Sequence, residues 1–287
     1  METHPGIVDR IKCPDWMDII EPARAAGKIY IHFPLRLGEG DGDFIDTETG
    51  SAPDWKRIED LLRITETKYL NFHFWWEGED TPLDPAQVRT AEIDRLVERA
   101  CLDIQPVVRR FGAERVIMEN LPDFTRTSPQ CLLPGVIRCV VEETGIGFLY
   151  DIAHGRLAAR KLRIDEREYV KLLPLERTRE VHITGIQPLE GHWLNLLEQA
   201  GMAERVFAEI KRGEMDHLPL ADGDWIFFGW VLQQLCSRTV ALPEIVAFEY
   251  GGVSGVLEAL GELEYLNLQT PRLKQMIREA EKCMSLA

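Results

Sequence analysis

Seven short apolar segments of this chain end in, or lie just before, a histidine or an acidic residue. They are Tyr30–His32, Leu70–His73, Val116–Glu119, Phe148–Asp151, Glu180–His182, Met215–His217 and Val246–Glu249. Their length and their content of β-branched and aromatic residues predict β-strands. A strand buried on both faces leaves such side chains without water, so each needs a compensating partner. A bound metal cluster is a partner that would serve all of them at once.

The chain has 287 residues, of which 45% are hydrophobic and 28% are charged. These proportions are typical of a globular protein with a sizeable core, and barrel folds of this length commonly form one domain. We therefore expect a single domain over residues 1–287. No apolar run reaches the roughly 18 residues of a membrane span. The six scattered cysteines form no CxxC pair and follow no secretory signal, which predicts a soluble, cytoplasmic protein with reduced thiols.

The excess of acidic over basic side chains argues against some classes of binding partner. With 33 basic and 48 acidic side chains, the formal net charge is -15. Generic nucleic-acid binding requires clustered lysines and arginines that release counterions from phosphates, and no such stripe is present. We therefore expect no generic nucleic-acid partner.

Amphipathic segments alternate with the strand segments, which is the pattern of repeated βα units and predicts a parallel sheet. The expected helices are Trp55–Ile64, Pro85–Phe111 with a kink or split at Pro106, Pro134–Glu143, Asn195–Arg212, Trp225–Cys236 and Thr270–Ala287. A single closed (β/α)8 TIM barrel is the simplest α/β architecture, and an open doubly wound sheet is the alternative. The N-terminal strand is the least regular part, and either Pro5–Val8 or Trp16–Glu21 is expected to supply it. Gly38–Asp43 predicts a flexible loop.

The strand-terminal residues of a barrel converge at its carboxyl end, so ligands distant in sequence become neighbours there. Histidine and carboxylate ligands without thiolates suit iron, manganese or zinc, and there are too many of them for one ion. Asp151 and His154, just past one strand, are spaced to share an ion. Trp75 is a candidate for a pocket mouth, with ordinary packing as the alternative, and His192 is a candidate for substrate contact.

The ordered series of His, His, Glu, Asp-x-x-His, His, Asp-His and Glu resembles the xylose isomerase-like barrel superfamily. Within it, the multinuclear non-heme iron-dependent oxidases (MNIO) and the endonuclease IV type share this order. The local motifs are similar to those of the oxidases: His32–Gly38 to an HSVGLSLG-like segment, Asn71–Trp75 to SEHLxW, Glu119–Asn120 to EN, Tyr150–His154 to D-x-N-N/H, Leu173–Gly185 to LPxxRVxEIHLAG, Met215–Trp225 to DTHxxPVxxxVW, and Pro243–Tyr250 to a strand ending in EWD. Asp216 and His217 are adjacent where the family has an intervening residue, which leaves open which of the two coordinates.

The resemblance implies an enzyme with two or three iron ions that uses O2 to oxidise its substrate. Family members commonly modify cysteine or other side chains of ribosomally made precursor peptides, often with a partner protein that delivers the peptide. The implied metal ligands are His32, His73, Glu119, Asp151, His154, His182, Asp216, His217 and Glu249. Glu119 and Glu249 are the expected bridging carboxylates and, with Asp151, the expected catalytic residues. Arg36, Asn120, Trp75 and His192 are weaker candidates for substrate contact.

Three other functions fit parts of the pattern. A sugar isomerase or epimerase would use the same barrel with Mn²⁺ or Mg²⁺, but it requires mostly carboxylate ligands. An endonuclease IV-like hydrolase would use three Zn²⁺ ions, but the acidic composition opposes duplex binding. A degenerate barrel acting as a binding scaffold is the non-enzymatic alternative.

Overall fold

The computed structural model describes residues 8–76, 90–122, 128–201, 213–238, 242–252 and 255–285. The chain divides into two compact units. The N-terminal unit comprises Arg10–Val181 and Pro243–Ile245, and the C-terminal unit comprises Met1–Asp9, His182–Leu242 and Val246–Ala287. The architecture is mixed α/β, as predicted.

A mostly parallel sheet is the main β-structure. In the described residues it has seven strands in the order β11-β8-β7-β6-β5-β3-β4. Its strands are β3 (Leu35–Leu37), β4 (Phe44–Asp46), β5 (Leu70–His73), β6 (Val116–Glu119), β7 (Gly147–Asp151), β8 (Thr178–Ile183) and β11 (Ile245–Phe248). Strands β3, β5, β6 and β7 pair in parallel, whereas β4 pairs with β3 in antiparallel fashion. The predicted parallel sheet is therefore present.

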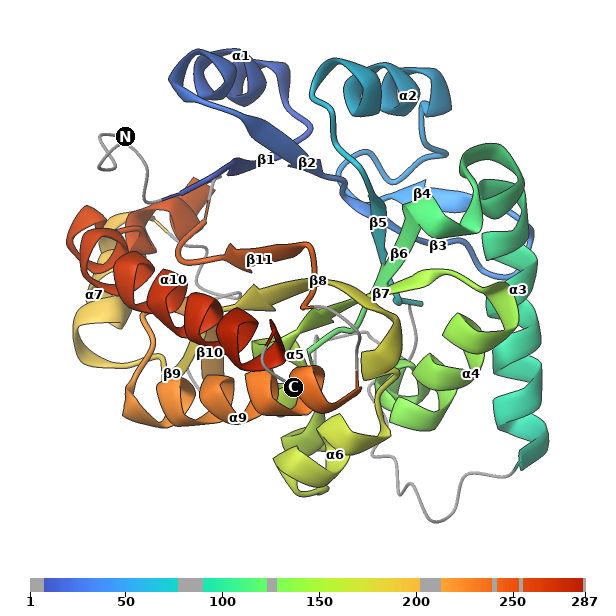
Figure 1. Ribbon diagram of the computed structural model, residues 1–287. Helices are drawn as coiled ribbons and strands as arrows, with labels where there is room; N and C mark the ends of the chain where they lie inside the picture. Colours follow the sequence, from blue (N-terminus) through green and yellow to red (C-terminus); the bar gives the residue numbers. More distant parts are fainter. Residues whose placement is uncertain are drawn as a thin grey trace. The chain divides into compact units, whose positions relative to one another are not determined.

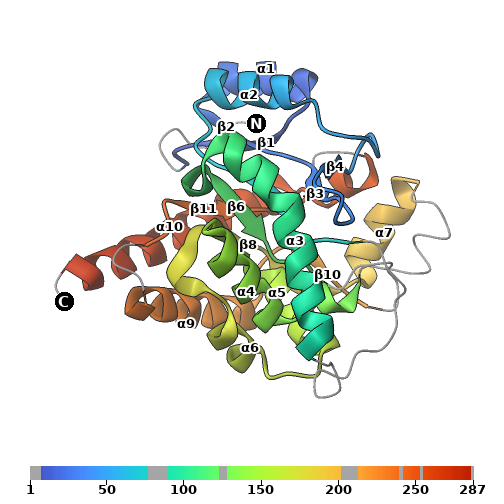
Figure 2. The same cartoon turned by 90° about the vertical axis from the view of Figure 1, so that its right-hand side faces the viewer.

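The described part of the N-terminal unit also contains α-helices. They are α1 (Met17–Ala26), α2 (Trp55–Ile64), α3 (Thr90–Phe111), α4 (Pro134–Thr144), α5 (Ile152–Lys161) and α6 (Glu166–Leu172), with short 3-10 turns at Ala113–Arg115, Pro129–Leu132 and Leu175–Arg177. Helices α1 and α2 lie side by side, and α3 packs along α4 (Figures 1 and 2). Helix α2 begins where the Asp54 carboxylate accepts a hydrogen bond from the Arg57 amide, and it buries Ile58, Leu61 and Leu62.

The C-terminal unit contains a second, smaller β-structure. Strands β9 (Gly185–Pro188) and β10 (Glu214–Leu218) form an antiparallel pair. The helical elements are α7 (Gly191–Gln199), a 3-10 helix η5 (Gly255–Leu260), and the packed helices α9 (Asp222–Arg238) and α10 (Leu263–Ser285) (Figure 1). The core of this unit is formed by Leu189, Trp193, Leu197, Leu218 and Leu260.

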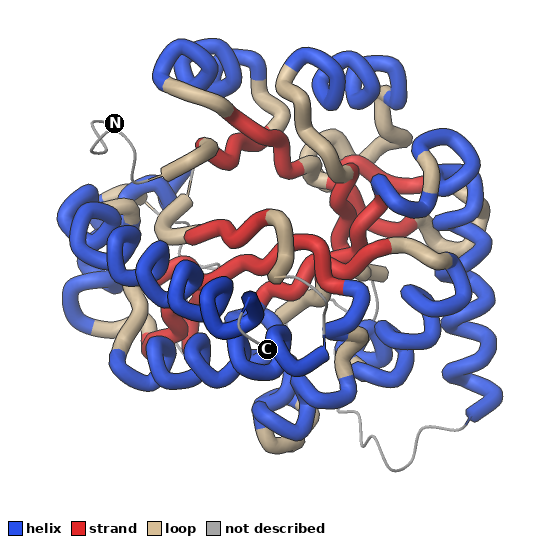
Figure 3. The backbone as a smooth tube through the Cα atoms, in the orientation of Figure 1, coloured by secondary structure: helices blue, strands red, loops and turns tan. Residues whose placement is uncertain are grey.

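Side chains join a separate strand pair to the main sheet. Strands β1 (Ile11–Pro14) and β2 (Ile29–His32) pair only with each other in the described residues; Figure 3 shows the strands in red. The Asn71 side chain of β5 accepts a hydrogen bond from the Phe33 amide at 2.8 Å and donates one to the Phe33 carbonyl at 3.2 Å. The Thr67 hydroxyl likewise accepts from the Ile31 amide at 2.9 Å. These side chains satisfy buried backbone groups where a strand ladder is missing.

Several expectations about individual elements were wrong. The strand before β2 is Ile11–Pro14, and Trp16–Glu21 instead begins α1; residues 5–7 lie outside the described residues. A strand with Lys12 at its centre lacks the continuous apolar run by which the other strands were recognised. Helix α3 is continuous through Pro106, so the helix is not split there. The carbonyl that proline deprives of a partner belongs to Leu102, an exposed residue, so water can satisfy it.

The segment Met215–His217 also differs from expectation, because β10 pairs in antiparallel fashion with β9 and does not join the parallel sheet. Polar and apolar residues do not alternate regularly there, and the pairing register shifts between Met215 and Leu218. The Gly38–Asp43 loop is held to α3, since the buried Asp103 carboxylate accepts hydrogen bonds from the Gly40 and Gly42 amides at 3.0 and 2.9 Å. Among the described helices, none has both the length and the apolarity needed to cross a bilayer.

Replacing Asn71 by alanine is expected to lower the free energy of unfolding by at least about 2 kcal/mol, because it leaves the buried amide and carbonyl of Phe33 without partners. Urea denaturation followed by circular dichroism measures the change. Asn195→Ala removes an exposed amide from α7 and is the matched control, with an expected change below about 0.5 kcal/mol. Equal effects of the two substitutions would contradict the assigned role of Asn71.

Candidate metal site

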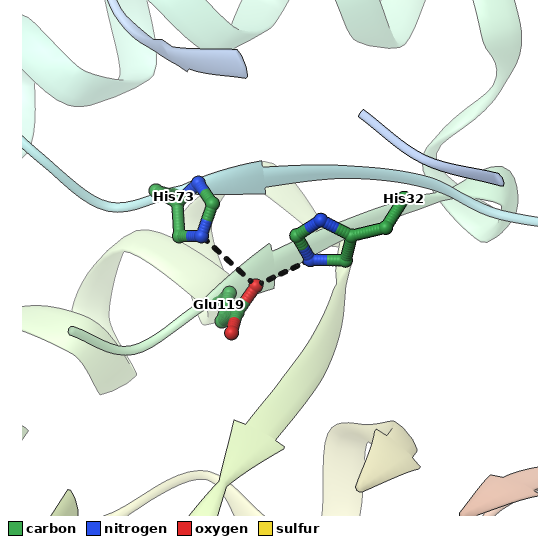
Figure 4. A group of neighbouring side chains, drawn as sticks. All are labelled: His32, His73 and Glu119. Atoms are coloured by element: carbon green, nitrogen blue, oxygen red, sulfur yellow. Dashed lines mark hydrogen bonds and ion pairs between the residues drawn. The ribbon is translucent and has the colours of Figure 1, made fainter. Parts of the chain in front are cut away.

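Three predicted ligands, His32, His73 and Glu119, meet at the ends of neighbouring strands. They are the last residues of β2, β5 and β6, and the parallel register sets His73 directly beside Glu119. The His32 Nε2 and His73 Nε2 atoms lie 2.9 and 3.4 Å from the same carboxylate oxygen, Oε2 of Glu119 (Figure 4). One ligand atom from each residue lies within 4.8 Å of the others. This spacing allows the three side chains to hold one metal ion.

Burial keeps the two imidazoles neutral. It lowers the pKa of His32 well below its ordinary value, and the positive charge of Lys12 lowers it further, while Glu119 acts in the opposite direction. Burial likewise lowers the pKa of His73. Neutral imidazole is the form that binds metal ions. The side chain of Glu119 is only 1% exposed, so its negative charge needs a nearby cation or proton.

The hydrogen bonds of His73 assign its tautomer. Its Nδ1 atom lies 3.3 Å from the Leu35 carbonyl, which can only accept, so Nδ1 carries the proton of the neutral ring. The Nε2 atom then presents a lone pair to the Glu119 oxygen at 3.4 Å. Two acceptors at this distance repel each other unless a cation or proton lies between them. A backbone carbonyl that orients a ligating imidazole in this way is common around metal sites.

Asp151 and His154 lie at the start of α5, next to this group. The Asp151 carboxylate caps the helix by accepting a hydrogen bond from the His154 amide at 2.7 Å. The His154 Nδ1 atom lies 2.9 Å from the Asn120 carbonyl and 3.6 Å from Oε1 of Glu119, and Nε2 lies 3.8 Å from Oδ2 of Asp151. The Nδ1 proton is therefore assigned to the carbonyl contact, and the lone pair on Nε2 faces a carboxylate, as in His73.

Asn120 holds these two residues in place. Its side chain accepts a hydrogen bond from the Asp151 amide and donates one to the Asp151 carbonyl, each at 2.9 Å. Asn120 is fully buried. The Asn120 side chain thus makes the two hydrogen bonds that a neighbouring strand would make to Asp151. These bonds connect the end of β6 to the end of β7 and fix the position where α5 begins.

The C-terminal unit contains the other four predicted ligands. His182, fully buried in β8, places Nδ1 3.2 Å from Oε2 of Glu249. The Glu249 amide donates to the Ile183 carbonyl at 3.1 Å. His217 lies within the irregular part of β10 and has a positive φ of 58°, a conformation that is uncommon for residues other than glycine. Its Nδ1 lies 2.8 Å from the Glu249 carbonyl, and its own carbonyl accepts from the Gly251 amide at 2.8 Å.

These contacts bring His182, His217 and Glu249 together. Nδ1 of His217 is assigned the ring proton, which leaves Nε2 as the potential ligand atom. Asp216 precedes His217 in β10 and is partly buried.

The weaker candidates occupy different environments. The Arg36 guanidinium lies 5.3 Å from the Trp75 ring centroid and donates to the Leu37 carbonyl at 3.1 Å. Arg36 is opposite His73 in the strand register, so this cation–aromatic pair is close to the metal-binding group. His192 is exposed and lies 3.1 Å from the Glu262 carboxylate.

Three further polar residues, Lys12, Tyr30 and Glu180, were missed in the sequence. Tyr30 and Glu180 each precede a predicted histidine ligand by two residues, and a strand presents such residues on one face. The Tyr30 hydroxyl donates to Oε1 of Glu180 at 3.1 Å. Lys12 is paired with Tyr30 in the β1–β2 register. The two-residue spacing could have identified Tyr30 and Glu180, whereas Lys12 lies in the strand that was assigned incorrectly.

Lys12 interacts with carboxylates of the site. Burial lowers the pKa of Lys12 to about 8, and the negative charges of Glu119, Glu180 and Asp151 counteract part of that effect. The predicted ligands are thus accompanied by a positive charge supplied by the chain itself.

No family model matches the chain, and no curated protein matches it. The interpretation therefore depends on the chemistry of the site. Its donors are imidazole nitrogens and carboxylate oxygens, several are buried, and the assigned lone pairs face negative oxygens. Such a donor set fits a divalent metal ion.

The lowered histidine pKa values predict a pH dependence of stability in the metal-free protein. Unfolding restores an ordinary pKa near 6.5, so the unfolded chain takes up protons that folded His32 and His73 resist. The free energy of unfolding is therefore unaffected by these two histidines above about pH 6.5, and it decreases as the pH falls below that value. With a chelator present, His73→Gln is expected to reduce the loss of unfolding free energy between pH 7.5 and 5.5 by about 1 kcal/mol.

The control for that measurement is His192→Gln, which replaces an exposed histidine and should keep the wild-type pH dependence. Denaturant titrations at the two pH values give the comparison. An unchanged pH dependence in His73→Gln would show that His73 is not held neutral in the folded protein.

Proposed function

We propose that this chain is a multinuclear non-heme iron-dependent oxidase, which binds two or three iron ions and uses O2 to modify a substrate. The observation that carries the proposal is the meeting of His32, His73 and Glu119, in which an imidazole lone pair faces a buried carboxylate. The motifs around these residues resemble that family. Iron bound by nitrogen and oxygen donors would supply O2 binding and electron transfer.

More ligands are available than one ion requires. Five of the nine predicted ligands, His32, His73, Glu119, Asp151 and His154, belong to the N-terminal unit, and the other four belong to the C-terminal unit. The proposal assigns metal binding to both sets, since a single octahedral ion has six coordination positions. Glu119 and Glu249 would each offer two carboxylate oxygens to the metal ions.

The proposal includes a closed (β/α)8 barrel of the xylose isomerase-like type. Support comes from the parallel order of β3, β5, β6 and β7 and from the side chains that tie the β1–β2 pair to β5. In such a barrel the strand ends carry the catalytic residues. Strand-terminal His32, His73 and Glu119 agree with that arrangement.

The proposed substrate is a cysteine or another side chain of a ribosomally made peptide, which a partner protein delivers. Arg36 and Trp75 are proposed to contact it, because Arg36 is the register partner of His73 and its guanidinium lies 5.3 Å from the Trp75 ring centroid. Glu119, Asp151 and Glu249 would hold the metal ions and accept protons during turnover. The six free cysteines agree with a reducing, cytoplasmic location.

Protein purified without oxygen and reconstituted with ferrous iron is expected to retain at least two iron ions per chain. Elemental analysis after desalting gives the count. Zinc or manganese at full occupancy, with iron excluded, would favour the hydrolase or the isomerase instead. Metal content that stays far below one ion per chain after reconstitution would contradict every metal-dependent function considered above.

Glu119→Gln and His182→Gln are each expected to lower metal retention at least tenfold while circular dichroism stays unchanged, because each removes a ligand from one of the two sets. The matched controls are Glu244→Gln and His192→Gln, which alter a half-exposed carboxylate paired with Lys68 and an exposed imidazole. Wild-type metal content in both ligand variants would refute the proposed centre. Loss in only one of them would assign the metal to that unit alone.

A further inference from the structure

Lys12 lies in the strand pair that also carries His32, because the β1–β2 register sets Lys12 beside Tyr30 and Pro14 beside His32. Lys12 is partly buried in β1 and interacts electrostatically with Glu119, Asp151 and Glu180. These three carboxylate residues are each at most 3% exposed. Glu180 is further fixed by the hydroxyl of Tyr30 at 3.1 Å, and Tyr30 is the register partner of Lys12.

The ammonium of Lys12 offsets part of the repulsion among the carboxylates of this group. Three buried carboxylates repel one another strongly, and burying them uncompensated would cost several kcal/mol per ion. One ammonium among them leaves two negative charges when all four groups are ionised. Two negative charges are balanced by one divalent cation.

We infer that Lys12 is an internal counter-ion of the metal site, which stabilises the carboxylates before metal binds and limits the positive charge that this side of the site accepts. The inference rests on the proposed metal-binding function. In the metal-free protein the ammonium offsets repulsion among the carboxylates. Once a metal ion is bound, the same ammonium repels it, since like charges in a poorly screened interior repel each other. Lys12 thus stabilises the metal-free protein and lowers the affinity of the site for metal ions.

The test compares Lys12→Met with Lys12→Arg. Methionine keeps an unbranched apolar stem without the charge, and arginine keeps the charge. Zn²⁺ is the probe, because it does not change oxidation state. In Lys12→Met the thermal midpoint of the chelator-treated protein should fall by several degrees, whereas the Kd for Zn²⁺, measured by competition with a chromogenic chelator, should decrease at least tenfold. Lys12→Arg should bind Zn²⁺ within threefold of the wild type.

A second variant separates charge from packing. Lys12→Met combined with Glu180→Gln removes one positive and one negative charge, so the net charge of the group is that of the wild type. Its Zn²⁺ affinity should return to within threefold of the wild-type value. If Lys12→Met alone does not fold, the double variant tests the inference by itself. A Zn²⁺ affinity like that of the wild type supports the inference, and an affinity that differs from it more than tenfold overturns it.

The outcomes also separate this inference from the proposed function. Zn²⁺ binding that is equal or weaker in folded Lys12→Met would overturn the counter-ion role and leave the metal site intact. A wild-type protein that binds neither Zn²⁺ nor iron would overturn the proposed function, and the inference with it.

Discussion

The buried carboxylate of Glu119 is the constraint on which the site depends. It faces nitrogen atoms of His32 and His73 that burial keeps neutral, and the Leu35 carbonyl takes the ring proton of His73. An anion that is 1% exposed and meets a lone pair must have positive charge nearby. The arrangement of β2, β5 and β6 is therefore costly in the absence of cations and becomes favourable with them, which is the reason to regard this part of the fold as a binding site.

Two asparagines supply hydrogen bonds that a continuous sheet would otherwise provide. Asn71 pairs with both backbone groups of Phe33, and Asn120 pairs with both backbone groups of Asp151. A carboxamide has the donor and acceptor of a peptide unit, so it can replace one rung of a ladder. Each asparagine lies beside residues proposed to bind metal. The positions of His32, Asp151 and His154 thus depend on amide side chains as much as on strand pairing.

The sequence predicted some parts of this structure well and others poorly. Strands β5 and β6 and helix α2 have the expected bounds, because their apolar patterns are strong. The meeting of His32, His73 and Glu119 was predicted as well, since parallel strands align their ends. Strand β1 was missed because Lys12 interrupts its apolar pattern. The antiparallel pairing of β10 depends on a partner, β9, whose four residues give little signal of their own. The roles of Asn71 and Asn120 could not be predicted, because a side chain that replaces backbone hydrogen bonds leaves no periodic pattern.

Three imidazoles, those of His73, His154 and His217, are oriented by main-chain carbonyls of Leu35, Asn120 and Glu249. A carbonyl oxygen is present whatever side chain its residue carries. Point mutation of the accepting residue therefore leaves the acceptor in place, provided that the backbone keeps its path. Most single-residue substitutions at Leu35, Asn120 and Glu249 would therefore leave the orientation of the imidazole rings unchanged. Insertions, deletions and prolines would alter it, because they redirect the backbone. Drift in the surrounding sequence can thus be extensive while the geometry of the imidazoles persists.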